Sequence, residues 1–198
     1  MRVLVACEYS ARVRDAFRKR GHDAWSCDLL ECEGDPQWHL QQPVEEVLDQ
    51  QWDLMIAHPP CTHLAVSGSR HFPEKIRDGR QGEALRFVRL LMNSSIPRWC
   101  IENPVSVISS AIRKADQIIQ PWEHGHGEVK ATCLWLQNLP RLTPSNCVEG
   151  REEIVHRMPP GPDRWKDRSR TYIGVAEAMA QQWGARDLPP LMDQLSIF

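Results

Sequence analysis

A cysteine stands at the start of a polar loop, directly after an apolar run and two prolines. The run from Leu54 to Ala57 is typical of a short buried strand, and Pro59 and Pro60 cannot continue its hydrogen-bonded ladder. Cys61 is therefore expected just beyond the carboxyl end of a strand, where α/β enzymes bind their ligands. A thiol in that place is a candidate nucleophile.

A carboxyl group follows a second short apolar run. Residues 99–101 predict a strand, and Glu102 comes directly after them. Parallel strands end at one edge of a sheet, so Cys61 and Glu102 are expected to lie close together. The thiol could add to an electron-poor ring while the acid supports the change of charge. The alternatives are an ordinary loop thiol and a carboxylate at the start of a helix beginning near Pro104.

Strands and helices alternate along most of the chain. Strands are predicted over residues 2–7, 23–27, 54–57, 99–101 and 131–136, and helices after Ser10, after Pro43, over residues 84–92 and over residues 173–183. Ser10 is the expected N-cap of the first helix, and Gly21 is expected to end it. This order predicts an α/β, Rossmann-like fold with a mostly parallel sheet and helices on both faces.

The composition fits one globular domain over residues 1–198. The stretch 140–169 lacks periodicity and predicts a long loop or small subdomain, and a proline-bearing tail follows the last helix.

A formal net charge of -2 excludes a global attraction to phosphate. Any contact with nucleic acid must therefore come from local clusters, of which the best is Arg164, Lys166, Arg168 and Arg170, interleaved with Trp165 and Tyr172.

Seven cysteines form an odd set, which favours reduced thiols over a disulfide framework. No apolar run approaches the ~20 residues of a membrane span, so we expect a cytoplasmic protein without membrane contact. Possible metal ligands occur at His58, Cys61 and His63 and at His124 and His126. Neither group has the paired Cys-x-x-Cys spacing of a structural zinc site, and we predict no metal.

Together these segments resemble the DNA cytosine-5 methyltransferase family. Pro60-Cys61 matches the family's Pro-Cys motif at the end of the fourth strand, and Glu102-Asn103-Pro104 closely matches its Glu-Asn-Val motif. The resemblance implies a Rossmann-like methyltransferase fold, DNA as partner and S-adenosylmethionine as methyl donor. It further implies that Cys61 is the covalent nucleophile on a flipped cytosine and that Glu102 holds and protonates the base edge.

The resemblance places the donor at the first strand–helix turn and beside the nucleophile. The cofactor-binding residues that it implies are Cys7, Glu8, Tyr9, Ser10, Asp28, Leu29, Pro59 and Pro60. Asp28 follows the second strand and corresponds to the family's acid for the ribose hydroxyls. The turn lacks the family's glycines, and residues 39–43 lack its Gly-Asp aspartate, for which Gln41 or Gln42 could substitute.

The family's Gln-x-Arg-x-Arg strand has its best match in residues 128–136. Lys130 corresponds to one catalytic cation, and Thr132 stands in place of the second. The DNA-binding residues that the resemblance and the nearby donors imply are Ser67, Arg70, Asn103, Thr132, Arg168 and Arg170. The final helix resembles the family's Gly-Asn helix, with Gly174 followed by Val175. Residues 140–169 replace a large target-recognition domain, which implies a compact, phage-type member with low selectivity or a specificity partner.

Two other functions remain open. An amino-group methyltransferase of DNA is one, since His58-Pro59-Pro60-Cys61 superficially matches Asp-Pro-Pro-Tyr, although both outer residues differ. The other is an inactive relative that binds DNA or a partner protein, because the donor motifs lack their glycines and aspartate. The oligomeric state is not indicated by the sequence.

Overall fold

A seven-stranded sheet forms the centre of the computed structural model, which describes residues 1–162 and 164–185. Its strands are β1 (Arg2–Ala6), β2 (Asp23–Cys27), β3 (His39–Leu40), β4 (Leu54–Ala57), β5 (Trp99–Pro104), β6 (Gln117–Ile119) and β7 (Thr132–Gln137). They lie in the order β3-β2-β1-β4-β5-β7-β6. The pairs from β3 to β5 are parallel, whereas β7 is antiparallel to both β5 and β6.

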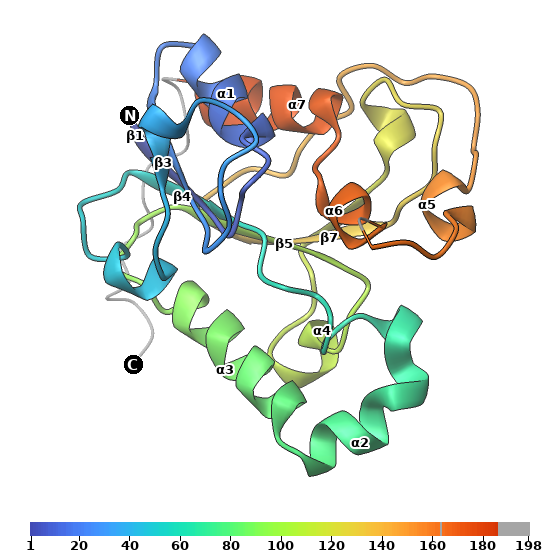
Figure 1. Cartoon of the computed structure of the whole chain (residues 1–198). Helices are drawn as coiled ribbons and strands as arrows, with labels where there is room; N and C mark the ends of the chain where they lie inside the picture. Colours follow the sequence, from blue (N-terminus) through green and yellow to red (C-terminus); the bar gives the residue numbers. More distant parts are fainter. Residues whose placement is uncertain (163, 186–198) are drawn as a thin grey trace.

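Helices cover both faces of this sheet (Figure 1). On one face α1 (Arg12–Lys19) packs beside α7 (Ile173–Trp183), and on the other lie α3 (Arg80–Met92) and α4 (Ile108–Ala111). The shorter helices are α2 (Phe72–Arg77), α5 (Ile154–Arg157) and α6 (Arg164–Ser169), and the 3-10 turns are η1 (Pro36–Trp38), η2 (Val44–Glu46), η3 (Val66–His71) and η4 (Pro121–Glu123). The predicted α/β, Rossmann-like fold, with a mostly parallel sheet and helices on both faces, is confirmed.

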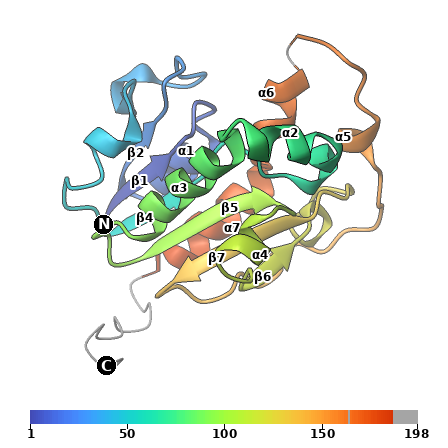
Figure 2. The same ribbon diagram turned by 90° about the horizontal axis from the view of Figure 1, so that it is seen from below.

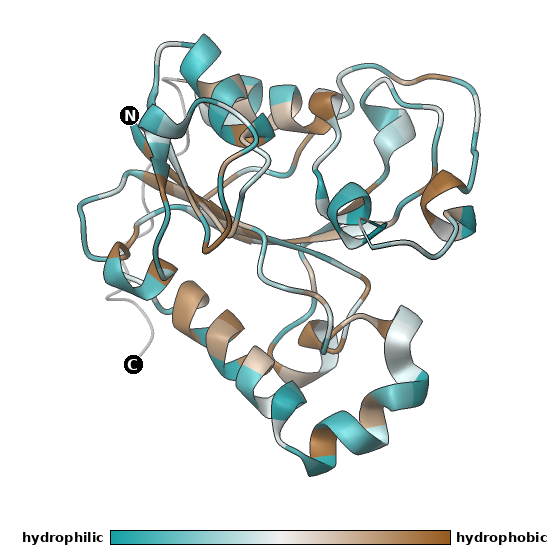
Figure 3. Ribbon diagram, viewed as in Figure 1, coloured by the Kyte–Doolittle hydropathy of each residue, from teal (hydrophilic) through white to brown (hydrophobic). Residues whose placement is uncertain are grey.

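The strands are apolar on both sides because each side faces a layer of helix. Leu4 and Met55 pack with the core under α3, whereas Val3, Val5 and Ile56 pack with α1 and α7. Strands buried on both faces carry continuous apolar runs rather than alternating ones. Figure 3 shows these central strands in brown, the hydrophobic end of the scale, whereas much of the outer loops is teal or white.

The strand order creates a crevice at one edge of the sheet. From β1 the chain continues outward to β2 and β3, and then returns to the other side of β1 to form β4 and β5. Loops leaving β1 and β4 therefore diverge, and ligands of such sheets bind between them. Figure 2 shows α3 crossing the face of β4 and β5, the two strands that end at the Cys61 and Glu102 segments.

Several sequence predictions need correction. The N-cap of α1 is Ala11 and not Ser10, and no side chain of the capping residue bonds to the helix. Gly21, with φ of 81°, follows the end of α1 as expected. Strand β6 and helix α2 were not predicted, because β6 has only three residues and α2 is short and carries charged residues.

The stretch after β7 is a long loop with two short helices, α5 and α6. Single bridges join Asn146 to His124 and Glu152 to Glu128, which fasten this loop to the segment before β7. The predicted tail, residues 186–198, lies outside the described residues. Among the described helices, none combines the length and the apolarity needed to cross a bilayer.

Candidate active site

A pocket of about 100 Å³ opens at the carboxyl ends of β1, β4 and β5. Its lining residues are Cys7, Glu8, Tyr9, Ser10, His58, Pro59, Pro60, Cys61, Glu102, Asn103, Pro104, Lys130, Arg168, Ser169 and Thr171. The structure therefore brings together all three residues expected to be catalytic. It also brings six of the eight expected cofactor residues to the same place, leaving Asp28 and Leu29 outside the lining.

The turn that carries Cys61 is fixed from the neighbouring strands. The His58 amide donates to the carbonyl of Ala6 at 2.9 Å, and the Asn103 side-chain amide donates to the carbonyl of Pro59 at 2.8 Å. Asn103 is only 1% exposed. The DNA contact expected for Asn103 does not fit this burial, because its amide group is used to hold β5 against the Pro-Pro turn.

Two side chains from the helical layer hold the loop after Cys61. Lys75 of α2 donates to the carbonyl of Thr62 at 2.6 Å, and Gln81 of α3 donates to the carbonyl of His63 at 3.1 Å. Both side chains are largely buried. Sequence analysis missed these residues, because a lysine and a glutamine in helices carry no signal of a distant partner.

Glu102 does not face the pocket alone. His58 Nδ1 lies 2.9 Å from Glu102 Oε2, and the two side chains are 9% and 15% exposed. Burial by itself would raise the pKa of Glu102, but the hydrogen bond and charge of His58, helped by Lys130, bring the pKa below its ordinary value. Burial opposes the charged form of His58, yet Glu102 and Glu8 raise the pKa of the imidazole. Both directions indicate an ion pair.

The Cys61 thiol lies between opposing charges. Burial and the charge of Glu102 raise its pKa, whereas Lys130 and Arg168 oppose the rise. The pKa of Lys130 is lowered by burial, against the pull of Glu102 and Cys61. Its Nζ donates to the carbonyl of Arg168 at 2.7 Å. Because the thiolate is the reactive form, a ligand that neutralises Glu102 would activate Cys61.

The Glu8 carboxylate caps the start of α1. Its carboxylate accepts from the backbone amides of Val13 at 2.7 Å and Arg14 at 3.2 Å, and Ser10 Oγ donates to it at 3.3 Å. The side chain is 4% exposed. These bonds satisfy N–H groups that the start of a helix leaves without partners. The cofactor contacts expected for Glu8 and Ser10 do not fit this use of their polar atoms.

Replacing Glu8 tests this capping role. We expect Glu8→Ala to lower the free energy of unfolding by about 2 kcal/mol, because two buried backbone amides lose their acceptor. Glu8→Gln keeps one acceptor and is expected to lose roughly half as much. Urea unfolding measures both. A Glu8→Ala protein as stable as the wild type would contradict the capping role.

The turn around Glu8 reaches a glycine-like shape without glycine. Cys7 has φ of 57° and Ala11 has φ of 61°, both in the left-handed region that residues with a Cβ seldom adopt. The glycines missing from the sequence therefore did not prevent the sharp strand-to-helix turn. Each such residue costs of the order of 1–2 kcal/mol, which the surrounding structure must offset.

Asp28 and Leu29 lie past the end of β2, next to the crevice but outside the pocket lining. Asp28 Oδ1 accepts from the Leu30 amide at 3.0 Å, and burial raises the pKa of its carboxyl group. The charges of Asp28 and His58 influence each other, which places them in one electrostatic environment. Leu29 is 69% exposed. A ligand longer than the pocket could reach both.

A segment from α6 to α7, residues 164–171, lies across the β1–α1 turn, and we name it the strap. Tyr9 Oη donates to the carbonyl of Lys166 and lies within hydrogen-bond distance of Ser169 Oγ, both at 2.9 Å. Arg12 donates to the carbonyl of Thr171 at 2.8 Å. The strap brings Arg168 and Ser169 into the pocket lining.

The remaining expected DNA contacts divide into two groups. Arg170 donates to both oxygens of Glu33, at 2.8 and 2.5 Å, and Thr132 is 9% exposed with its hydroxyl on the Lys130 carbonyl. Both side chains thus have partners within the chain, and their expected DNA contacts stay predictions. Ser67 and Arg70 lie exposed in η3, outside the pocket lining, and keep their expected role.

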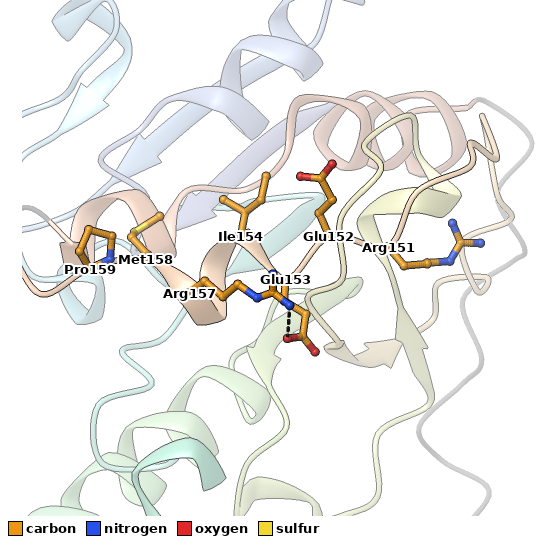
Figure 4. A pocket seen from close by; sticks show the side chains of 7 residues that line it. All are labelled: Arg151, Glu152, Glu153, Ile154, Arg157, Met158 and Pro159. Atoms are coloured by element: carbon orange, nitrogen blue, oxygen red, sulfur yellow. Dashed lines mark ion pairs between the residues drawn. The ribbon is translucent and has the colours of Figure 1, made fainter.

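A larger hollow of about 610 Å³ lies elsewhere, within the loop that contains α5 (Figure 4). It is lined by one stretch of chain: Arg151, Glu152, Glu153, Ile154, Arg157, Met158 and Pro159. Arg157 and Glu153 form an ion pair at 3.7 Å across it. Its two arginines are balanced by two glutamates and no nucleophile is present, so the smaller pocket remains the candidate active site.

In the part of the chain that the structure describes, no three His, Cys, Asp or Glu side chains converge as metal ligands. His124 instead pairs its Nδ1 with Ser145 Oγ at 3.0 Å, and His126 Nε2 accepts from the Gly174 amide at 3.1 Å. Two of the four histidines that the sequence offered as possible ligands thus have structural partners.

No family model matches the sequence, and no curated protein matches it. Solved structures do match, and one of them is a proposed DNA modification methyltransferase encoded within a prophage of E. coli. The identity is 13% and the TM-score 0.47, with 75% of this chain and 52% of that chain covered. This chain thus spans about half the length of that protein. A likeness at this level does not by itself assign a function.

Proposed function

We propose that the protein is a DNA methyltransferase that uses S-adenosylmethionine and acts on carbon 5 of cytosine. One observation carries the proposal: Cys61 and Glu102 line a single pocket at the ends of the adjacent strands β4 and β5. A nucleophile and a carboxyl group that share a pocket with a cation have the composition needed for covalent addition to a base. Lys130 and Arg168 supply the positive charge.

The size of the pocket favours a base as the group bound there. Pockets for whole drug-sized ligands measure about 300–1,000 Å³, several times the volume found here. A single pyrimidine ring is a far smaller ligand. Enzymes that modify bases extrude the target nucleotide into such a pocket, since the ring is otherwise covered by its neighbours in the stack.

We assign the cofactor to the β1–α1 turn and the end of β2, next to this pocket. Cys7 and Ala11 give that turn the sharp backbone that glycines commonly provide. The residues that we assign to S-adenosylmethionine are Cys7, Tyr9, Pro59 and Pro60, which also line the pocket, and Asp28 and Leu29, which lie outside it. Asp28 offers a carboxylate to hydroxyl groups, and the exposed Leu29 offers an apolar surface to a ring. The cofactor supplies the methyl group that carbon 5 receives.

The side chains then divide the remaining work. Cys61 Sγ, as thiolate, forms a bond to carbon 6, and the electrons displaced into the ring make carbon 5 nucleophilic. Glu102 holds the N3 and N4 edge, where the charge of the ring changes. After carbon 5 is methylated it loses its proton to water, the bond between Sγ and carbon 6 breaks, and the thiolate is restored. Lys130 and Arg168 stabilise the thiolate before the bond to carbon 6 forms and after it breaks.

DNA contact is assigned to donors on the loop after Cys61 and on the strap. Ser67 and Arg70 lie on the loop that follows Cys61, and Arg168 projects from the strap into the pocket lining. Trp165 is 51% exposed beside Tyr9 and offers a stacking surface. With a net charge of -2, affinity for DNA depends on these local groups.

Mass analysis of nucleosides tests the proposal. Double-stranded and single-stranded DNA, incubated with the protein and S-adenosylmethionine and then digested, are expected to yield 5-methyldeoxycytidine. N4-methyldeoxycytidine or N6-methyldeoxyadenosine would instead assign an amino-group methyltransferase. No methylated base, together with no calorimetric binding of S-adenosylmethionine, would leave the reading of an inactive relative that binds DNA or a partner.

A further inference from the structure

We propose that His58 is a positioning residue that supplies Glu102 with the proton delivered to ring nitrogen N3 of the target cytosine. The inference rests on the proposed function and deepens it. Sequence analysis considered His58 only as a metal ligand and as part of a rival motif. The structure places its imidazole between the β1–α1 turn and Glu102, in the lining of the pocket.

Of the two ring nitrogens of His58, one is held by Glu102 and the other has no hydrogen-bond partner among the described residues. Nδ1 lies 2.9 Å from Glu102 Oε2, at a sequence separation of 44 residues. The His58 side chain is 9% exposed, and its buried Nε2 has no hydrogen-bond partner among the described residues. An imidazole without a charge partner would be expected to be neutral at such burial, so the contact with Glu102 decides its state.

Groups from four elements face His58, and most are acidic. Glu102 comes from β5, Glu8 from the β1–α1 turn and Asp28 from the end of β2, whereas Lys130 precedes β7. Burial raises the pKa of Glu8 and of Asp28, so Glu102 is the main partner that favours a protonated imidazole. The raised pKa of His58 and the lowered pKa of Glu102 agree with a proton that lies on the imidazole of the free enzyme.

This arrangement resolves a conflict in the chemistry of Glu102. An ionised carboxylate can accept from the N4 amino group of cytosine, but it has no proton to give to N3, which is an acceptor. As Sγ bonds to carbon 6 and electrons shift to N3, Nδ1 of His58 gives its proton to the Glu102 carboxylate, and Glu102 gives a proton to N3. When Sγ leaves, N3 returns the proton and the pair regains its starting state. Each turnover therefore leaves the proton count of the pair unchanged.

The pH dependence follows with a definite sign. Turnover needs a charged His58 and an ionised Cys61 at the same time, and the pKa of each group lies above its ordinary value. The rate therefore rises with pH as the thiolate forms and falls at higher pH as the imidazolium is lost. Without a titratable proton at position 58 only the ionisation of Cys61 remains, so the descending limb requires His58.

Two variants separate proton supply from simple packing. In His58→Asn the side-chain amide can still donate to Glu102 but carries no titratable proton. We expect kcat to fall by about 10²-fold or more, the usual effect of losing a general acid, with KM for DNA unchanged and the descending limb absent. His58→Ala should be equally slow and should recover activity when imidazole is added. His22→Asn, at the opposite edge of the sheet, should keep the wild-type profile.

A measurement without DNA keeps this inference separate from the proposed function. The His58 ring, titrated by NMR, should show a lower pKa in Glu102→Gln than in the wild type. If the wild type forms 5-methyldeoxycytidine while His58→Asn retains both kcat and the descending limb, the inference alone fails. If the wild type forms none, the proposed function fails. An unchanged His58 pKa in Glu102→Gln would overturn the pair itself.

Discussion

DNA that contains 5-fluorocytosine is expected to form a covalent adduct with the wild-type protein when S-adenosylmethionine is present, and Cys61→Ser is expected to form none. The fluorine atom replaces the hydrogen that carbon 5 must lose, so the bond between Sγ and carbon 6 cannot break. Denaturing gel electrophoresis detects the adduct as a shifted band. Methyl transfer to ordinary DNA should fall in Cys61→Ser by roughly a thousandfold or more, because without the covalent nucleophile carbon 5 of the cytosine is not activated.

Cys147→Ser is the matched control for this experiment. Cys147 is exposed and lies outside the pocket lining, so its variant should form the adduct in wild-type yield. The raised pKa of Cys61 adds a second signature: adduct formation on the acid side of the profile should quicken as pH rises. Equal adduct yield from Cys61→Ser and the wild type would overturn the assignment of the nucleophile.

The sheet and the place of the nucleophile could be predicted because their signals are local. Leu54 to Ala57 is apolar at every position and ends at a proline pair, which defines both the strand and its last residue. The predicted strands at residues 23–27 and 54–57 match β2 and β4 in both bounds. A parallel sheet then places Cys61 and Glu102 at one edge without further information.

The partners of the site residues could not be predicted, because they are set by contacts between distant segments. His58 and Glu102 are 44 positions apart, and the pair of Lys75 with Thr62 depends on the docking of α2, a helix with no clear apolar face. The capping of α1 was misread for a related reason. Ser10 is a frequent N-cap type, but the left-handed Ala11 moves the helix start and Glu8 reaches it instead.

Residue type also left the partners of two polar side chains unpredicted. Arg170 and Asn103 were expected to contact DNA, since arginine and asparagine commonly do. In the structure Arg170 is held by Glu33 and by Asp167, and Asn103 holds the carbonyl of Pro59. The sequence shows which side chains can donate a hydrogen bond, but it does not show which acceptor each of them binds in the folded protein.

Gly174→Ala is expected to destabilise the protein by about 3 kcal/mol, the upper range for overpacking. Gly174 is the second residue of α7, and a Cβ built there would overlap the backbone carbonyl oxygen of His124 and lie 3.0 Å from its carbonyl carbon. A backbone group cannot rotate away as a side chain can. The Gly174 amide also donates to His126, so the helix cannot shift without losing that bond.

Gly82→Ala is the matched control, since Gly82 also lies near the start of a helix, α3. Its added Cβ would meet only the flexible end of Arg86, at 3.6 Å, and we expect a gain of about 0.5–1 kcal/mol from helix propensity. Urea unfolding followed by tryptophan fluorescence measures both variants. A Gly174→Ala protein as stable as the wild type would show that the backbone before β7 can move away from α7 at little cost in free energy. Lys130 belongs to that segment, so such a protein should then lose methyl transfer while remaining folded.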